Sequence, residues 1–230
     1  MEEVVHNILL RVQPKYSRKY MKSKKHFKIF ILLILFGGIL ISCKSKEEKL
    51  PILGSKEPIS DGRDTIYHRI PDFSFTNQDG KTITAKTFEN KVYVADFFFT
   101  SCTTICPIMG NEMQRVYNKY KDNEKVAFIS HSIDPNNDTI SVLKNYSDDL
   151  GVNNDQWHFV TGQREKIFDI AENHYMVSAQ EDTTVPDGVI HSGAFILVDS
   201  EKRIRGYYDG TNTEEVDKLI SDIPTLLKYK

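Results

Sequence analysis

The stretch VYVADFFFTSCTTICP, residues 92–107, combines a strand pattern, two cysteines and the start of a helix. Six of the eight residues from Val92 to Phe99 are β-branched or aromatic, with little alternation, which is typical of a central strand covered on both faces. Pro107 fits the first turn of a helix. Apolar residues recur beyond it at helical spacing, namely Met109, Met113, Val116, Tyr117 and Tyr120. The stretch therefore predicts a buried strand and a helix, with Cys102 and Cys106 at their junction.

The flanking sequence predicts alternating strands and helices. Phe73–Phe75 and Thr82–Thr84 flank an Asp-Gly turn and predict a hairpin. Further strands are expected at 126–133, 157–160, 194–199 and 204–208, and helices at 139–150, 165–174 and 213–227. A short segment at 177–180 leads to the last two strands, which form a hairpin. This order predicts an α/β sandwich with a mixed central sheet and an N-terminal β-hairpin.

Composition limits the classes of function. The 230 residues are 40% hydrophobic and 27% charged, which is typical of one globular domain with appendages. The net charge is −2, and no cluster of Lys and Arg occurs outside the N-terminus, so nucleic-acid binding is not expected.

The N-terminus has the pattern of an export signal. Residues 21–42 begin with a cationic stretch, which the apolar run 29–41 follows. A helix of that run would be only about 20 Å long, shorter than the roughly 30 Å hydrocarbon core of a membrane. Leu40-Ile41-Ser42-Cys43 resembles the lipobox of bacterial lipoproteins, which implies a lipid on Cys43 and a location outside the cytoplasm. An uncleaved signal anchor is the alternative.

These patterns divide the chain into four parts. Residues 1–20 match no targeting pattern, and we expect them to be untranslated or without function. The signal peptide spans 21–42, and the charged, Pro- and Gly-containing stretch 43–62 suits a flexible tether. The folded domain is expected at 63–230.

Cys102 and Cys106 are the candidate reactive residues. Side chains four residues apart share one face of a helix, and a helix N-terminus favours thiolate over thiol. Such a pair can bind a soft metal or cycle to a disulfide. A structural disulfide is the alternative, although a bridge over so short a loop would add little stability.

His191 is the candidate third ligand, because it comes just before the predicted strand 194–199. Taken alone, a histidine at a strand end is more often structural. In thioredoxin-like folds, however, the loop before this strand packs against the cysteine-bearing helix, and oxidoreductases of that class carry a cis-proline there. The nearest proline here is Pro186. Two thiolates and one imidazole suit copper in either oxidation state, whereas structural zinc would usually take a fourth protein ligand.

The chain resembles the SCO/SenC family of copper-binding thioredoxin-like proteins, which help to assemble the dinuclear copper site of cytochrome c oxidase. The matching segments are FTSCTTICP (99–107), ISHSIDPNNDT (129–139), His191 and YYDGT (207–211), within a span of about 71–222. The resemblance implies that Cys102, Cys106 and His191 bind copper and that the cysteines form a reversible disulfide. This chain differs from many family members at three positions beside the ligands: Ile190 stands where they have Asp, and Thr103 and Thr104 stand where they often have Pro and Asp.

The predicted site and the resemblance together suggest two alternative functions. The first is a metallochaperone, rather than an enzyme, that delivers copper to the copper-bearing subunit of the oxidase or to another acceptor. The alternative is a thiol-disulfide reductase acting on that subunit or on other exported proteins. Either function would need a thiol-disulfide reductant as a partner. A peroxiredoxin-like peroxidase is weaker, because Phe99 occupies the position where that family has threonine.

The remaining candidate residues have structural explanations. Met109 and Met113 could be soft ligands, but their helical spacing favours the core. His131 could approach the site, but an ordinary sheet position is favoured. Asp134 and Asp138 are expected to shape a turn and cap the following helix. The other histidines considered, His68, His158 and His174, are expected to be structural or solvated.

Overall fold

Strand β5 (Val92–Phe98) is an interior strand of the main sheet and is buried along its whole length. In this computed structural model, residues 49–58, 65–181 and 189–228 are described. The predicted signal sequence, Cys43 and Pro186 lie outside these ranges. None of the helices in the described part is long and apolar enough to cross a membrane.

Seven strands of the described chain form one mixed sheet in the order β11-β10-β5-β6-β7-β3-β4. Strands β5, β6 and β7 are parallel, and the other pairs are antiparallel. The bounds of the strands that join β5 are β3 (Ser74–Asn77), β4 (Thr82–Thr84), β6 (Val126–Ser132), β7 (Trp157–Thr161), β10 (Ala194–Val198) and β11 (Ile204–Asp209). The predicted α/β sandwich with a mixed sheet is confirmed.

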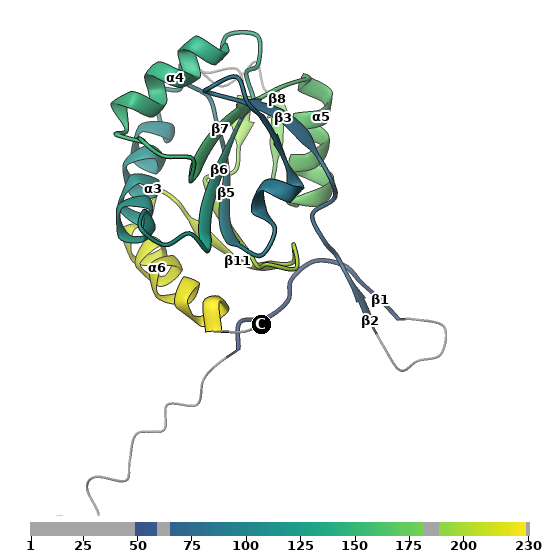
Figure 1. Cartoon of the computed structure of the whole chain (residues 1–230). Helices are drawn as coiled ribbons and strands as arrows, with labels where there is room; N and C mark the ends of the chain where they lie inside the picture. The colour runs from purple at the N-terminus through teal and green to yellow at the C-terminus, as the bar shows by residue number, and fades with distance from the viewer. Residues whose placement is uncertain (1–48, 59–64, 182–188, 229–230) are drawn as a thin grey trace, which may run out of the picture. The chain divides into compact units, whose positions relative to one another are not determined.

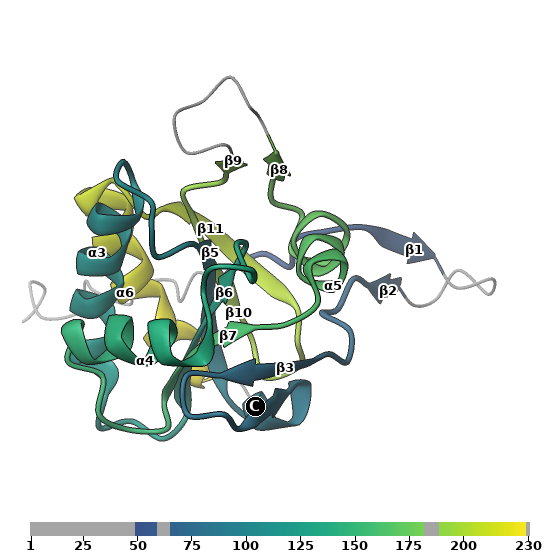
Figure 2. The same cartoon turned by 90° about the horizontal axis from the view of Figure 1, so that it is seen from above.

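Helices cover both faces of this sheet (Figures 1 and 2). On one face lie α3 (Cys106–Tyr120), α4 (Ile140–Asp149) and α6 (Thr213–Lys228), and on the other α5 (Arg164–Asp169) with the π-helical turn η3 (Ile170–His174). Neighbouring residues of β5 pack against the helices on opposite faces of the sheet. Phe98 stacks on Tyr146 of α4 with 5.1 Å between the ring centroids, and Phe97 contacts Tyr175, which follows η3, with 5.6 Å between the centroids.

The predicted N-terminal hairpin is formed by β3 and β4, with the short 3₁₀ helix η2 (Ala85–Phe88) after it. Gly80 in the turn has a φ of 71°, a left-handed conformation that glycine adopts without strain. The side-chain oxygen of Asn77 accepts from the backbone N–H groups of Asp79 and Lys81. The Asp-Gly turn therefore folds as its sequence indicates.

Two small sheets extend beyond the main one. β1 (Lys56–Pro58) pairs with β2 (Thr65–Tyr67), and β8 (Ala179–Glu181) pairs with β9 (Val189–His191). β1 lies inside the stretch 43–62 that was interpreted as a tether. N-terminal to β1, the carbonyl groups of Leu50 and Pro51 accept hydrogen bonds from Arg205, which holds the backbone at these two residues.

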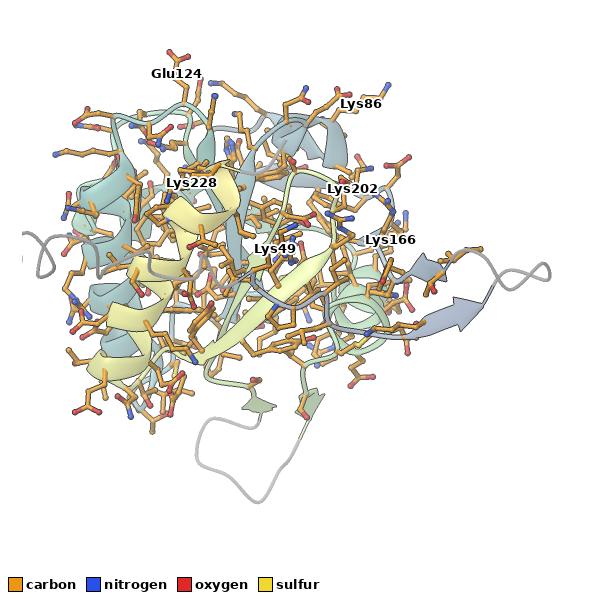
Figure 3. The ribbon with its side chains drawn as sticks, turned by 90° about the horizontal axis from the view of Figure 1, so that it is seen from below. Lys49, Lys86, Glu124, Lys166, Lys202 and Lys228 are labelled. Atoms are coloured by element: carbon orange, nitrogen blue, oxygen red, sulfur yellow. The ribbon has the colours of Figure 1, made fainter. Side chains whose placement is uncertain are left out.

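Charged side chains such as Lys86 and Glu124 lie on the outside of the domain, as Figure 3 shows. The long apolar side chains are inside: Trp157, Phe128, Phe159 and Phe195 are each at most 1% exposed. Met109 and Met113 are also buried, as the helical spacing predicts.

Candidate metal centre

Cys102 lies in the loop after β5, and Cys106 is the first residue of α3. Pro107 follows in the first turn, as predicted. The backbone N–H of Cys102 donates to the carbonyl of Phe99 at 3.3 Å, so the chain forms a tight turn directly after the strand. Both cysteines are thiols in this structure, with exposed fractions of 6% and 3%.

The two sulfur atoms have different surroundings. The sulfur of Cys102 lies 3.5 Å from both the backbone nitrogen of Cys106 and the hydroxyl of Thr104. Burial alone would raise the pKa of Cys102, but hydrogen bonds with Thr104 and Cys106 outweigh burial and lower it below the ordinary thiol value. Burial raises the pKa of Cys106. Cys102 is therefore the thiol that ionises first.

The predicted third ligand, His191, is the last residue of β9, and its backbone pairs with Ala179 of β8. Its side chain is not among those that the structure describes. Two residues later, a Cβ added to Gly193 would lie 3.7 Å from the side chain of Ile105, the residue before Cys106. The backbone that follows His191 therefore lies beside the cysteine-bearing turn.

The segment YYDGT packs against this same backbone. The N–H of Gly210 donates to the carbonyl of Gly193 at 2.7 Å, and a Cβ on Gly210 would come within 2.9 Å of that oxygen. Only glycine fits this close approach. A cleft of about 440 Å³ opens here, lined by Ile105, Ser192, Gly193, Ala194, Tyr207, Tyr208, Asp209 and Thr211.

Among the described side chains, no three His, Cys, Asp or Glu residues are grouped so that they could hold a metal ion. The set Cys102, Cys106 and His191 falls outside that test, because the imidazole of His191 is not described. The two thiols supply soft ligands, one from the loop before α3 and one from the first residue of that helix, and such ligands suit copper(I). The described part of the site thus provides two of the three predicted ligands.

His131 lies in β6, and its ring faces away from the cysteines. The ring stacks on Phe97 at 4.8 Å and meets Phe75 edge-on at 5.6 Å, on the face of the sheet that η3 covers. Burial lowers the pKa of His131 to about 3, so it is neutral at physiological pH. The prediction of an ordinary sheet position is confirmed.

The other three histidines also have structural surroundings. A ring nitrogen of His68 lies 2.8 Å from the carbonyl of His174, and the two rings stack at 6.1 Å. His158 is 3% exposed, and burial lowers its pKa to about 4. None of these three contacts the cysteine loop through an interaction seen among the described residues.

The two aspartates of the DPNND segment behave differently. Asp134 shapes the predicted turn, because its carbonyl accepts from the backbone N–H of Asn137 at 3.1 Å. The prediction that Asp138 caps the next helix is wrong. The N-cap of α4 is Thr139, whose hydroxyl accepts from the N–H of Val142. The side chain of Asp138 turns instead toward the cysteine loop, where it binds Thr100.

Asp96 is a buried acid that the sequence reasoning passed over. It is 4% exposed in β5, and one of its carboxylate oxygens has no hydrogen-bond partner. Burial raises the pKa of Asp96 to about 7, and the hydroxyl of Ser130 partly offsets that rise. A lone aspartate within the apolar run VYVADFFF was the signal that could have identified it.

Comparison with known proteins places these features in one family. The family model described as SCO1/SenC matches residues 63–228. A SCO1/SenC family lipoprotein from Bacillus anthracis is 30% identical, with a TM-score of 0.64, and the match covers 70% of this chain and 96% of that one. The predicted thioredoxin-like fold agrees with this likeness.

Two further solved structures are informative. BsSco, described as a member of the Sco family of cytochrome c oxidase assembly proteins with a disulfide switch, is 31% identical with a TM-score of 0.64; the match covers 80% of this chain and 100% of BsSco. ScoI of Bradyrhizobium japonicum, solved with copper bound, is 26% identical with a TM-score of 0.54, over 68% of this chain and 98% of that one.

Proposed function

This chain belongs to the SCO1/SenC family, and on that premise we propose that it is a copper chaperone acting outside the cytoplasm. It binds copper through Cys102, Cys106 and His191 and delivers the metal to the copper-bearing subunit of a cytochrome c oxidase. A lipid on Cys43 holds the domain at the membrane.

The main support is the pair of thiols at the start of α3, where the backbone that follows His191 lies against Ile105. A copper-bound relative and an oxidase-assembly relative share this fold. A site with three protein ligands leaves copper open to attack by ligands of an acceptor, so the metal can pass on by ligand exchange.

The redox state of the thiols would control whether the protein can bind copper. Both cysteines must lose a proton to bind copper, and a Cys102–Cys106 disulfide removes two of the three ligands. Forming that disulfide needs an oxidant to take up two electrons, and an external thiol reductant restores the dithiol. The disulfide switch described for BsSco supports this cycle.

A thiol-disulfide reductase is the second candidate, favoured by the unequal thiols. The lowered pKa of Cys102 suits an attacking thiolate, and the buried Cys106 could resolve a mixed disulfide. In that case copper would be incidental and the product would be a reduced partner protein.

Copper(I) binding separates the two candidates. The chain starting after Cys43 retains every residue of the described core, so it serves for the measurement. We expect one copper(I) per chain. Binding in His191→Ala should weaken by more than the about 10- to 100-fold that losing an outer-shell partner costs, because His191 is proposed as a ligand itself. His174→Ala is the matched control, because His174 lies at the end of η3 on the other face of the sheet. Equal affinity in His191→Ala and the parent, with fast thiol-disulfide exchange, would favour the reductase.

The lipid anchor has its own test. Mass spectrometry of the mature N-terminus should find a lipid-modified Cys43 as the first residue. An unmodified Cys43 in membrane-bound protein would overturn the lipoprotein assignment and leave the uncleaved signal anchor.

A further inference from the structure

We infer that Asp138 is a positioning residue for the loop that carries Cys102. This inference rests on the proposed function, because the loop matters as a holder of a metal-binding thiol. Asp138 is fully buried, at the point where β6 has ended and α4 has not yet begun. Burying a carboxylate is costly unless hydrogen-bond donors surround it.

The donors come from two places far apart in sequence. The hydroxyl of Thr100 donates to one carboxylate oxygen at 2.5 Å, and the hydroxyl of Ser132 donates to the other at 2.5 Å. The backbone N–H of Thr100 lies 3.3 and 3.2 Å from the two oxygens. Hydrogen bonds to an ionised acceptor are about twice as strong as neutral ones.

These bonds fix the loop at its first residues. Thr100 precedes Cys102 by two positions, and Ser132 is the last residue of β6, the strand beside β5. The carboxylate therefore ties the exit of β5 to the exit of β6, which the bond from Ile133 N–H to the carbonyl of Phe98 also joins at 2.9 Å. Asp138 acts on the thiol of Cys102 through Thr100, which it holds by both the backbone N–H and the hydroxyl.

A role in α4 does not account for this arrangement. Thr139 already caps that helix, and both partners of the Asp138 carboxylate, Thr100 and Ser132, lie outside it. The carboxylate thus holds Cys102 ready beside Cys106 before any metal arrives. Preorganised ligands bind more tightly, because less ordering remains to be done when the metal binds.

The test uses the full chain in detergent micelles, with Cys43→Ala in every protein so that Cys102 and Cys106 are the only thiols. The variants are Thr100→Val, Asp138→Ala and the double variant. Asp199→Asn is the matched control, since Asp199 is another buried aspartate but binds Arg203 and Arg205 instead of the loop. Urea unfolding first establishes conditions in which each variant is folded.

Copper(I) affinity is measured by competition with a chromophoric chelator. We expect Asp138→Ala to weaken binding about 10- to 100-fold, the usual cost of losing an outer-shell partner. Thr100→Val loses one hydrogen bond and should weaken binding roughly three- to tenfold. The double variant should bind copper(I) no more weakly than Asp138→Ala, because Asp138→Ala alone already removes the hydrogen bond from the Thr100 hydroxyl. Asp199→Asn should match the parent.

The second readout needs no copper. The equilibrium between the dithiol and the Cys102–Cys106 disulfide is measured against a thiol redox buffer. It should shift about tenfold toward the disulfide in Asp138→Ala, because this variant loses the hydrogen bonds that hold the loop in its dithiol geometry. If the folded variants match the parent in both measurements, or if Asp199→Asn shows the same losses, the inference fails. If the parent binds no copper(I), the proposed function fails, and the disulfide equilibrium still decides the role of Asp138.

Discussion

The backbone N–H of Cys106 donates to the sulfur of Cys102 across 3.5 Å, so the first turn of α3 acts on the thiol that precedes it. That bond favours a thiolate, because a negative sulfur accepts more strongly than a neutral one. The two cysteines of one site therefore differ in acidity, with Cys102 below the ordinary thiol pKa and Cys106 above it.

Alkylation should reveal this difference. At pH 7, iodoacetamide should modify Cys102 at least about tenfold faster than Cys106, since thiolate is the reacting form. Peptide mass spectrometry after short exposures measures both rates in one sample. Cys106→Ser and Cys102→Ser are the controls for each site. Equal rates for the two thiols at pH 7 would contradict the assignment.

Gly110 and Tyr146 form a second testable pair. A Cβ on Gly110 would lie 3.0 Å from the Tyr146 hydroxyl, so Gly110→Ala alone gains helix propensity but crowds that oxygen. We expect Gly110→Ala to be nearly neutral in the parent. In Tyr146→Phe, which removes the hydroxyl, it should raise the free energy of unfolding by about 1 kcal/mol.

Urea unfolding of the four proteins in this cycle measures the coupling between the two positions. An equal effect of Gly110→Ala in both backgrounds would mean that the hydroxyl moves aside without cost.

Local patterns in the sequence were sufficient for the main sheet and for the cysteine turn. The run VYVADFFF identified β5, and Pro107 placed the start of α3. β1 and β2 were missed, because three-residue strands carry little periodic signal and the stretch before them is held by Arg205 from far along the chain.

Asp138 was misassigned for a related reason. A helix cap can be inferred from residues next to the helix, whereas the bond to Thr100 joins positions 38 residues apart. Nothing in the local segment distinguishes an aspartate that caps a helix from one that reaches a neighbouring strand. Of the predicted ligands, the structure describes the thiols of Cys102 and Cys106 but not the imidazole of His191, and copper binding by all three stays a prediction.

Arg205 holds the start of the domain in place. It is 8% exposed, pairs with Asp199 at 2.8 Å and donates to the carbonyl groups of Leu50 and Pro51. Arg205→Ala should lower the free energy of unfolding by about 2 kcal/mol, because Arg203 still pairs with Asp199 and offsets part of the loss.

Limited proteolysis should then cut Arg205→Ala faster than the parent near Leu50, because the backbone there loses its donors. Arg69→Ala is the control, since its ion pair with Glu201 is half exposed and contributes little. Unchanged cutting near Leu50 in Arg205→Ala would show that other contacts hold the segment.

His131 should make the domain sensitive to acid. Its pKa is about 3 in the folded protein against 6.5 for an unperturbed histidine, so the unfolded chain takes up a proton between these values and the folded chain does not. The contribution of the neutral His131 to the free energy of unfolding is complete above pH 6.5, and this contribution is lost as pH falls toward 3. At pH 5 the loss from this residue is about 2 kcal/mol.

His131→Phe should remove that loss, because phenylalanine fills the same space between Phe97 and Phe75 without a titrating nitrogen. Urea unfolding at pH 7.5 and at pH 5 should show a smaller drop in the variant by about 2 kcal/mol. Asp96 acts in the opposite direction: burial raises its pKa to about 7, so protonation of Asp96 favours the folded state as pH falls from 7 toward 3.8. Both proteins retain Asp96, so its effect cancels in the comparison. An equal drop in the free energy of unfolding in the two proteins would mean that His131 does not titrate as its burial requires.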